Sequence, residues 1–417
     1  MRIAIYHNLP SGGAKRTLCE SARRLALRHQ VDVYTLSSAD HGFADLRPHV
    51  ANHRVYDFQS RPLLDSPWGR LNQGLRLTDL ARLRLLSRTV AQDMRAGSYD
   101  VAFIHACQFE KAPSVLAYLG DLPSIYYCQE PLRVLYEQQP PRPYDDSSSR
   151  RRMALNRVDP LLRLYLETVR RVDQGNTRRA TRVLVNSQYM RQTVGRIYRI
   201  SPQLSYHGID SERFAPLALE KEPFLLSVGS LTPLKGFDFL VEALAELPAD
   251  QRLPLVLASN FQNLPERAFL EQLAQQKQVE LRFLGHVSDA QLVELYNRAL
   301  LTVYAPLREP FGLVPLESMA CATPVVAVGE GGTAETILHE QTGLLVERDT
   351  RRFAAAVERL LANPGLAAAY GQAGRQQVEQ HWTWAKATQT VEQHLLAMVH
   401  SRAVDGLPQQ TIALNER

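Results

Sequence analysis

The chain has 417 residues, of which 45% are apolar and 22% charged, an ordinary globular balance with room for two or three domains. No apolar run approaches the roughly 20 residues that span a bilayer, and the first residues, MRIAIYHNLP, lack the long apolar stretch of an export signal. The spacing of the four cysteines fits neither a disulfide framework nor a CxxC metal site. We therefore expect a cytoplasmic protein.

The net charge of +5 is unevenly distributed along the chain. Residues 1–200 contain 31 Lys and Arg against 18 Asp and Glu, a balance of +13, whereas residues 201–417 have a balance of −8. Such asymmetry indicates different partners for the two halves. The alternative is that each half is simply kept soluble by its own charge.

The first half begins with the pattern of a parallel α/β domain. Residues 2–6 (RIAIY) form a short apolar run, residues 8–13 (NLPSGG) a turn, residues 14–29 a helical pattern and residues 31–36 (VDVYTL) a second strand. Further strands are predicted at residues 101–105, 124–128 and 182–186. This order of strand, glycine-containing loop, helix and strand is typical of a doubly wound sheet.

The same architecture starts again in the second half. Residues 224–228 (FLLSV) predict a strand, residues 229–236 a loop and residues 237–246 a helix. More strands are predicted at residues 255–258, 281–283, 301–304 and 324–328. We therefore predict two Rossmann-like domains, at residues 1–207 and 208–383, and a final helix at about residues 384–417 that crosses back to the first domain.

Two segments of the first half have an unusual composition. Residues 138–152 (QQPPRPYDDSSSRRR) predict a flexible loop, and residues 150–182 contain ten arginines and three acids. A similar basic, leucine-rich pattern covers residues 70–95. Within the arginine-rich segment, apolar residues fall near helical spacing: Leu161, Leu162, Tyr165, Leu166 and Val169. Such a helix can lie on an anionic membrane surface, or its apolar face can be buried in the domain core.

Residues 305–335, APLREPFGLVPLESMACATPVVAVGEGGTAE, are the most informative segment. Two loops, 306–312 and 329–332, each lead from a predicted strand into a helix. They therefore lie at the carboxyl ends of parallel strands, where open α/β sheets bind ligands. Glu309 and Glu317 are eight positions apart, and their carboxylates could accept hydrogen bonds from sugar hydroxyls. Taken alone, such a pair is more often a loop acid and a helix-surface acid.

In this context the residues resemble a known family. Glu309-Pro310-Phe311-Gly312 through Glu317 is similar to the Glu-x7-Glu motif of family four retaining glycosyltransferases (glycosyl transferases group 1), which have the GT-B fold. The resemblance covers most of the chain, and its other blocks are Gly12-Gly13, residues 228–236 (VGSLTPLKG), residues 283–295 (FLGHVSDAQLVEL), SMACATPVVA and GGTAE. One acidic pair is a weak signal, but these blocks follow the family's order.

The resemblance implies a role for each matching residue. Glu317 would accept hydrogen bonds from the donor ribose, and Glu309 would hold the donor sugar together with the backbone N–H groups of Phe311 and Gly312. Donor contacts are also implied for Leu313, Ser230, Gly12, Gly13, Val287, Gly332 and Thr333. No cofactor or metal is implied, because no Asp-x-Asp lies in a suitable loop.

Lys235 is the second residue, with Glu309, that we predict to be catalytic. A lysine after a strand of this kind can neutralise a departing diphosphate. The family commonly has an arginine five residues earlier, where this chain has Ser230, which brings a hydroxyl and no charge. The family often places a histidine against the transferring sugar, where this chain has Gln129, which cannot carry a proton. His105 is a further candidate for contact with the sugar or acceptor.

We expect a retaining, metal-independent glycosyltransferase of cell-envelope or polysaccharide biosynthesis. It would move a sugar of mannose or glucose type from a GDP-, UDP- or ADP-sugar, bound by the second half, to a glycan or lipid-linked acceptor, bound by the first. Peripheral attachment to the inner face of an anionic membrane is a further expectation, and we expect no nucleic-acid partner. The alternatives are a GT-B phosphorylase or epimerase, and a non-catalytic protein that binds nucleotide-sugars.

Overall fold

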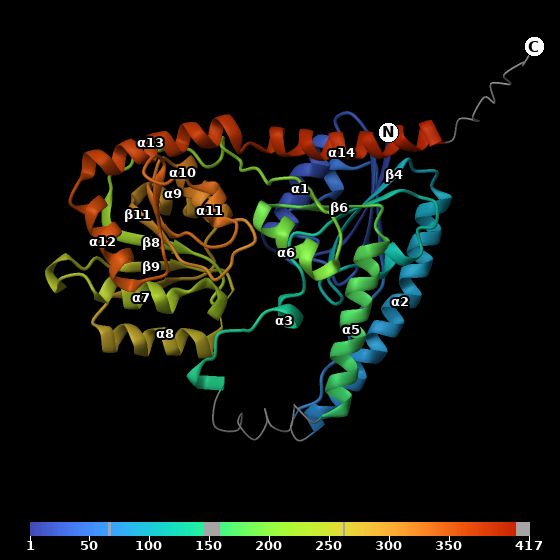
Figure 1. Cartoon of the computed structure of the whole chain (residues 1–417), viewed down its shortest axis with the longest axis horizontal. Helices are drawn as coiled ribbons and strands as arrows, with labels where there is room; N and C mark the ends of the chain where they lie inside the picture. Colours follow the sequence, from blue (N-terminus) through green and yellow to red (C-terminus); the bar gives the residue numbers. More distant parts are fainter. Residues whose placement is uncertain (66–67, 146–158, 262, 406–417) are drawn as a thin grey trace, which may run out of the picture.

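The structure is a computed structural model that describes residues 1–65, 68–145, 159–261 and 263–405. They form two parallel sheets, each with helices on both faces, and the two α/β units lie side by side (Figure 1). Two doubly wound sheets are the fold that the sequence predicts.

The first sheet has seven parallel strands in the order β3-β2-β1-β4-β5-β6-β7. Its strands are β1 (Arg2–Asn8), β2 (Gln30–Leu36), β3 (Asn52–Tyr56), β4 (Val101–Cys107), β5 (Ser124–Tyr127), β6 (Arg182–Val185) and β7 (Gln203–Leu204). The central strands are buried on both faces, which explains their near-continuous apolar sequence. The edge strands β3 and β7 are not among the predicted strands, because β3 (NHRVY) is polar and largely exposed and β7 has two residues.

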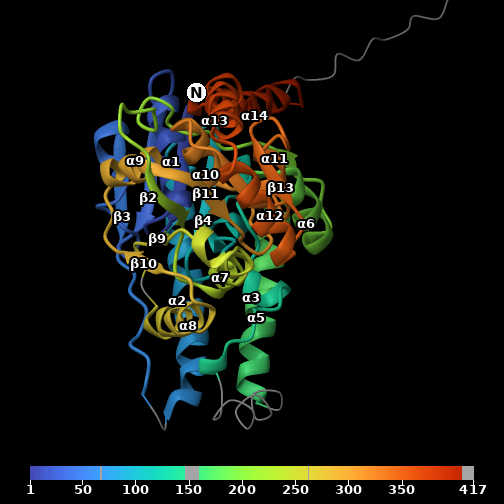
Figure 2. The same ribbon diagram turned by 90° about the vertical axis from the view of Figure 1, so that its left-hand side faces the viewer.

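The helices of this unit are α1 (Gly13–Leu25), α2 (Asn72–Ala96), α3 (Arg133–Tyr136), α5 (Pro160–Arg179) and α6 (Gln188–Tyr198). Helices α2 and α5 pack against each other and extend together beyond the sheet, as both views show (Figures 1 and 2). We call this pair the helical arm. The predicted apolar face of α5 lies within it, with Val169 buried and Leu161 near Gly74 of α2. Residues 146–158, which include the first arginines of the predicted basic segment, lie outside the described residues.

The second sheet has six parallel strands in the order β10-β9-β8-β11-β12-β13. Its strands are β8 (Glu222–Val228), β9 (Leu255–Ala258), β10 (Leu281–Leu284), β11 (Ala299–Tyr304), β12 (Val325–Val328) and β13 (Gly343–Val346). The short edge strand β13 is absent from the predicted strands. The helices are α7 (Phe237–Ala245), α8 (Leu264–Lys277), α9 (Asp289–Arg298), α10 (Leu313–Ala320), α11 (Thr333–Thr336), α12 (Thr350–Leu361) and α13 (Pro364–His381).

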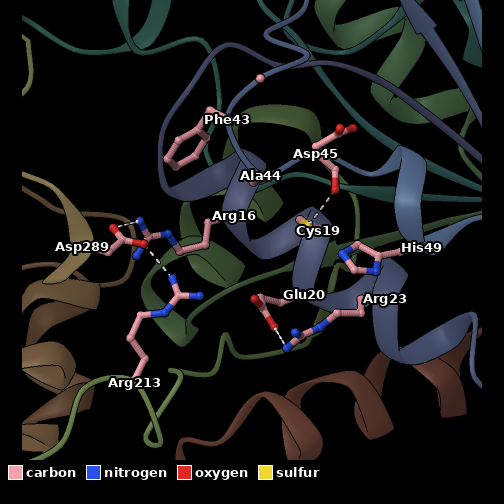
Figure 3. A pocket seen from close by; sticks show the side chains of 11 residues that line it. Arg16, Cys19, Glu20, Arg23, Phe43, Ala44, Asp45, His49, Arg213 and Asp289 are labelled. Carbon is pink, nitrogen blue, oxygen red and sulfur yellow. Dashed lines mark hydrogen bonds and ion pairs between the residues drawn. The ribbon is translucent and has the colours of Figure 1, made fainter.

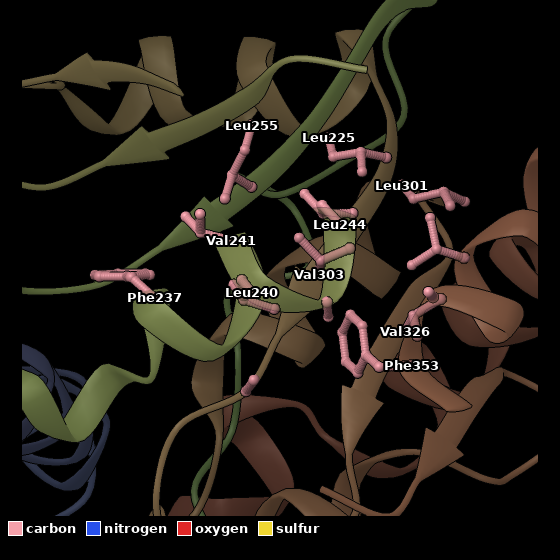
Figure 4. Packing of buried hydrophobic residues seen from close by; sticks show 14 of the residues in the cluster. Leu225, Phe237, Leu240, Val241, Leu244, Leu255, Leu301, Val303, Val326 and Phe353 are labelled. Carbon is pink, nitrogen blue, oxygen red and sulfur yellow. The ribbon is translucent and has the colours of Figure 1, made fainter. Parts of the chain in front are cut away.

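The core of the second unit forms between its sheet and the helices on one face. Leucines and valines of β8, β9 and β11 meet the apolar side of α7 and Phe353 of α12 (Figure 4). Residues such as Leu225, Leu240 and Val303 are fully buried. This burial fixes the sheet, and with it the loops at the strand ends.

The last helix, α14 (Trp384–Asp405), lies against the first unit. Its side chains Val391, Leu395 and Met398 join the core that contains Ile3 and Ile5 of β1. The chain passes back beside the linker: an added Cβ on Gly208 would lie 2.4 Å from the Trp384 nitrogen, so the backbones are in close contact. The division at residues 207 and 208 stays a prediction, and residues 406–417 of the predicted final helix lie outside the described residues.

Candidate active site

Two glycine-containing loops of the second unit pack backbone against backbone at the carboxyl ends of β11 and β12. Gly332 donates its N–H to the Glu309 carbonyl at 2.8 Å. Gly331 has a φ of +64°, and a Cβ there would lie 2.4 Å from the Glu309 oxygen. Glycine is therefore required where the loops touch, because a side chain would push them apart.

Helices that start at these loops have glycine N-caps, which leave backbone N–H groups without a side-chain partner. Gly312 precedes α10, Gly332 precedes α11, and Gly12 precedes α1 of the first unit. Helices α2, α3 and α7 also begin without a side-chain cap, and α7 does so at Gly236. Six other helices are capped by the side chains of Asp159, Ser187, Asn263, Ser288, Asp349 and Asn363. An uncapped helix start presents N–H donors and the positive end of the helix dipole, which suits an anion.

The starts of α1 and α10 face each other across the two units. A Cβ on Gly13 would lie 3.2 Å from Cδ1 of Leu313, whereas one on Gly12 would meet nothing within 4 Å. Gly12 has a φ of +138°, which L side chains rarely adopt. The predicted donor residues Gly12, Gly13, Gly312 and Leu313 are therefore gathered in one place.

Lys235 and Glu309, both predicted to be catalytic, form an ion pair. The Lys235 Nζ lies 3.0 Å from Oε1 and 2.9 Å from Oε2 of Glu309. Their side chains are 21% and 17% exposed, so the pair is half-shielded from water but open to a ligand. Ser230 is half-buried in the same loop after β8. The ammonium thus lies in the loop that follows β8, held by the loop that follows β11.

Glu317 is buried on α10 and accepts a hydrogen bond from the Tyr296 hydroxyl at 2.8 Å. Burial raises the pKa of the Glu317 carboxyl, and the nearby Arg16 guanidinium opposes that rise. Arg16 of α1 also pairs with Asp289 at 2.7 Å, and Arg213 pairs with the other Asp289 oxygen at 2.6 Å (Figure 3). Arg16, Arg213 and Asp289 border a cavity of about 370 Å³ between α1, the loop after β2 and the start of α9. The carboxylate that we predict to bind ribose thus lies near a charged junction between the units.

The other residues that we predict to contact the donor or the sugar lie in several separate segments. Gln129 is half-buried and its Nε2 lies 3.5 Å from the Ala14 carbonyl, beside the glycine loop of α1. The Thr333 hydroxyl is buried and has no hydrogen-bond partner among the described residues. Phe311 packs its ring against His207 and Trp382, so its side chain belongs to the core and only its backbone faces the loop. Val287 lies in the loop after β10, where both its backbone groups bond to Asn260.

His105 is fully buried, between the rings of Phe103 and Tyr127. Neither of its ring nitrogens has a hydrogen-bond partner within the described part of the chain. Burial lowers the pKa of His105 to about 3, and burial lowers that of His207 to about 3 as well. Both rings are therefore neutral near pH 7.

Several side chains that join the two units near the site were missed by sequence reasoning. The Glu335 carboxylate accepts from the backbone N–H groups of Gln188 and Tyr189 at 2.9 Å, and so caps α6 from the other unit. Ser187 donates to the Pro310 carbonyl at 2.6 Å, and Arg133 donates to the Leu307 carbonyl at 2.8 Å. Glu335 ends the GGTAE block, which was a signal for the loop but not for this contact.

Arg142 also joins the two units, although the sequence predicts its segment, residues 138–152, to be a flexible loop. It is buried against the second unit, where it pairs with Glu266 of α8 at 3.0 Å and with Asp238 of α7 at 2.8 Å. Glu266 is itself fully buried. Tyr144 also donates to Glu266 at 2.5 Å. Residues 142–144 therefore fasten a loop of the first unit onto the second.

Residues 1–65, 68–145, 159–261 and 263–405 contain neither a candidate metal site nor a candidate membrane span. No group of three or more His, Cys, Asp or Glu side chains there is arranged to hold a metal ion. No helix in these ranges is both long enough and apolar enough to span a membrane.

Known families and structures resemble this chain in both halves. The family described as "Glycosyltransferase Family 4" matches residues 11–213, and "Glycosyl transferases group 1" matches residues 208–377. Human alpha-1,3/1,6-mannosyltransferase ALG2 is 30% identical over 249 residues, which is 54% of this chain and 60% of that protein. Alpha-maltose-1-phosphate synthase of Mycobacterium tuberculosis is 32% identical over 251 residues, 53% of this chain and 64% of that protein. The chain spans about three fifths of the length of these curated relatives.

Solved structures match the fold over nearly the whole chain. Sucrose-phosphate synthase from Thermosynechococcus elongatus superposes with a TM-score of 0.72 at 23% identity and covers 96% of this chain and 99% of its own. Anabaena HepE in complex with UDP and glucose gives a TM-score of 0.68 at 19% identity, over 95% and 100% of the two chains. The predicted GT-B fold, with two Rossmann-like units, is confirmed. The chain belongs to the family four glycosyltransferases (glycosyl transferases group 1).

Proposed function

We propose that this chain is a retaining, metal-independent glycosyltransferase whose second domain, residues 208–383, binds a nucleotide-sugar. The observation that carries the proposal is that the uncapped helix starts at Gly12, Gly312 and Gly332 lie beside residues 310–313, next to Glu309 and its ion pair with Lys235. N–H groups and an ammonium in this arrangement neutralise a diphosphate without a metal ion. Glu317 then lies one helix turn further along α10, where it would bind the ribose.

We infer the reaction from the family resemblance, and the charges in the site support it. Lys235 stabilises the negative charge that builds on the departing diphosphate. Gln129 cannot accept a proton, and the buried His105 and His207 are neutral rings enclosed by other side chains. In the mechanism that the resemblance implies, the proton of the acceptor hydroxyl passes to a departing phosphate oxygen on the same face of the sugar, which retains the anomeric configuration.

The relatives support a range of donors. ALG2 is named as a mannosyltransferase, the mycobacterial relative as a maltose-1-phosphate synthase, and the HepE structure as a complex with UDP and glucose. Mannose or glucose transfer from a GDP-, UDP- or ADP-sugar fits these names. A thermal-shift panel of the three sugar nucleotides tests the proposal: at least one should raise the melting temperature, and no shift with any of them would contradict donor binding.

We propose a glycan or lipid-linked acceptor, bound by the first domain, in cell-envelope or polysaccharide biosynthesis on the cytoplasmic face of a membrane. The end of the helical arm supports peripheral attachment to that membrane, because apolar side chains are exposed there: Leu63, Leu64, Trp68, which is 65% exposed, and Leu71. Arg76, five residues after Leu71 on α2, is exposed as well. An apolar cluster with tryptophan and flanking cations suits the interface of an anionic bilayer.

Liposome binding tests the membrane proposal. Trp382 and Trp384 are buried, so a blue shift of tryptophan emission on mixing with anionic vesicles would report Trp68. Binding should weaken as salt rises, since salt screens surface charge. The double variant Trp68→Ser/Leu71→Ser should lose binding, whereas Leu27→Ser, at a residue 82% exposed elsewhere, should keep it. No binding to anionic vesicles at low salt would favour a soluble acceptor.

A further inference from the structure

The loop after β9 lies between two loops that we assign to the donor. Its residues 259–261 bond to both neighbours: Leu231 donates to the Phe261 carbonyl at 3.2 Å, and Ser259 donates to the Leu284 carbonyl at 2.8 Å. The first contact ties it to the loop with Ser230 and Lys235, and the second to the strand that leads to Val287. The loop is therefore held at the edge of the candidate donor site.

Asn260 of this loop makes a two-point contact with one peptide unit. Its Oδ1 accepts from the Val287 N–H at 2.7 Å, and its Nδ2 donates to the Val287 carbonyl at 3.0 Å. A carboxamide presents a donor next to an acceptor. The hydrogen-bonding edges of uracil, guanine and adenine also place a donor next to an acceptor, and proteins read bases through such edges. The Asn260 side chain therefore imitates a nucleobase on the Val287 backbone.

The two contacts exclude each other. The Val287 N–H is a single donor, so it serves either Asn260 or a base. The Asn260 side chain is exposed and packs into no core, so it can turn into solvent when a ligand arrives. Phe261, the next residue in the chain, is 58% exposed.

We propose that Asn260 occupies the position of the donor base in the unliganded protein and competes with it for Val287, so that this residue sets nucleotide affinity. The inference rests on the proposed donor function, and it takes the donor contact that the family resemblance implies for Val287 to be a contact with the base. It goes further in naming a side chain that must move before the base can bind.

Calorimetric titration of Asn260→Ala tests the competition. UDP, GDP and ADP are the base-containing probes, and ribose 5-phosphate and pyrophosphate are the base-free probes. The nucleotide that binds the unmodified protein should bind Asn260→Ala about three- to tenfold more tightly, the range expected when one or two exposed hydrogen bonds need no longer be broken. Affinity for the base-free probes should stay the same.

Asn263→Ala is the matched control, because Asn263 lies in the same loop but caps α8 by accepting from the Glu266 N–H. It should leave nucleotide affinity unchanged. Unchanged or weaker nucleotide binding by Asn260→Ala would overturn the competition while leaving the donor proposal intact. If the unmodified protein binds none of the three nucleotides, the donor proposal fails and this inference fails with it.

Discussion

Lys235 and Glu309 form one charged unit at the ends of β8 and β11. The carboxylate holds the ammonium in place, and a diphosphate bound as we propose would share it. The chain has a serine at position 230, where the resemblance suggests an arginine, so Lys235 supplies the cation of this loop. Because the two opposite charges offset each other, the charge that a ligand meets at this place depends on both residues.

Loss of Lys235 should therefore lower turnover more than binding. We expect Lys235→Ala to reduce kcat by about 10²-fold, the scale of losing one preorganised charge in a site, and to leave Glu309 facing the diphosphate unpaired. Steady-state kinetics with the preferred donor measure this. Lys277→Ala, at the end of α8, is the control and should retain full turnover. A Lys235→Ala enzyme with normal kcat would rule out the role in charge stabilisation.

Glu317 is expected to act in binding. Glu317→Ala removes the charged carboxylate that would accept hydrogen bonds from the ribose. The variant should therefore bind the nucleoside diphosphate more weakly by about 1.5–3 kcal/mol. Titration calorimetry on the folded variant measures the loss. Glu294→Ala, on the exposed side of α9, should bind normally. Equal affinity of Glu317→Ala and the unmodified protein would remove the ribose assignment.

Glu110 makes stability depend on pH. Burial raises the pKa of this carboxyl from its ordinary value of 4.5 to about 7, although it accepts hydrogen bonds from Ser114. The folded protein therefore binds this proton more tightly than the unfolded chain. Protonated Glu110 therefore contributes to the free energy of unfolding, and this contribution is complete below pH 4.5. The free energy of unfolding falls by about 2–3 kcal/mol as pH rises to about 7 and the proton is lost.

Denaturant unfolding between pH 4.5 and 7 measures this effect. Glu110→Gln should unfold with a much flatter pH profile, and Glu242→Gln, at an exposed position, should keep the profile of the unmodified protein. Identical profiles for Glu110→Gln and the unmodified protein would show that Glu110 is not the titrating group.

The sequence predicts those site residues whose role depends on the backbone of their own segment. The glycines at positions 12, 312 and 332 follow strands and start helices, a signal that a sequence displays directly. Arg142, Glu335 and Asn260 were missed because their partners are distant: Glu266 lies 124 residues from Arg142, and Glu335 lies 147 residues from Gln188. Neither periodicity nor composition reports such contacts.

Among the elements, central strands and long amphipathic helices were predictable, and edge strands were not. β12 is a continuous apolar run and β1 is apolar from Ile3 to Tyr6, because both faces of these strands are buried, whereas β3 is polar and largely exposed. The helix at residues 14–29 was predicted four residues too long, because α1 ends at Leu25 and the chain turns into β2. The loop of residues 138–145 departs most from expectation, since Arg142 anchors it to α7 and α8.

Arg142 makes this loop a structural tie between the units. Removing it would leave the buried Glu266 carboxylate without its cation, and breaking a buried pair in this way costs about 3–5 kcal/mol. We expect Arg142→Met to lower the free energy of unfolding by about that amount, and Glu266→Gln in the same chain to restore part of it. Denaturant unfolding measures both. Arg171 pairs with Glu167 at the surface, and its side chain is 77% exposed, so Arg171→Met should change the free energy of unfolding by less than about 1 kcal/mol. A similarly small effect of Arg142→Met would contradict the tie.

In the whole molecule, several contacts between the units involve the proposed donor loops, in addition to the Arg142 tie to α7 and α8. Ser187 and Arg133 hold the carbonyls of Pro310 and Leu307, Glu335 caps α6, and Arg16 reaches Asp289. Helix α14 then joins the end of the chain to the first core. Donor binding and the relative position of the two units are therefore expected to be coupled, because the same loops serve both.

The central claim is that the chain transfers a sugar from a nucleotide-sugar with retention. Proton NMR of the protein incubated with UDP-, GDP- and ADP-sugars tests it most directly, because slow transfer to water releases free sugar whose first anomer is visible. With one of these donors we expect the nucleoside diphosphate and a sugar that first appears in the donor's own anomeric configuration. Lys235→Ala should nearly abolish the signal. Release of the opposite anomer, release that requires inorganic phosphate, or no release from any donor that binds would contradict the account.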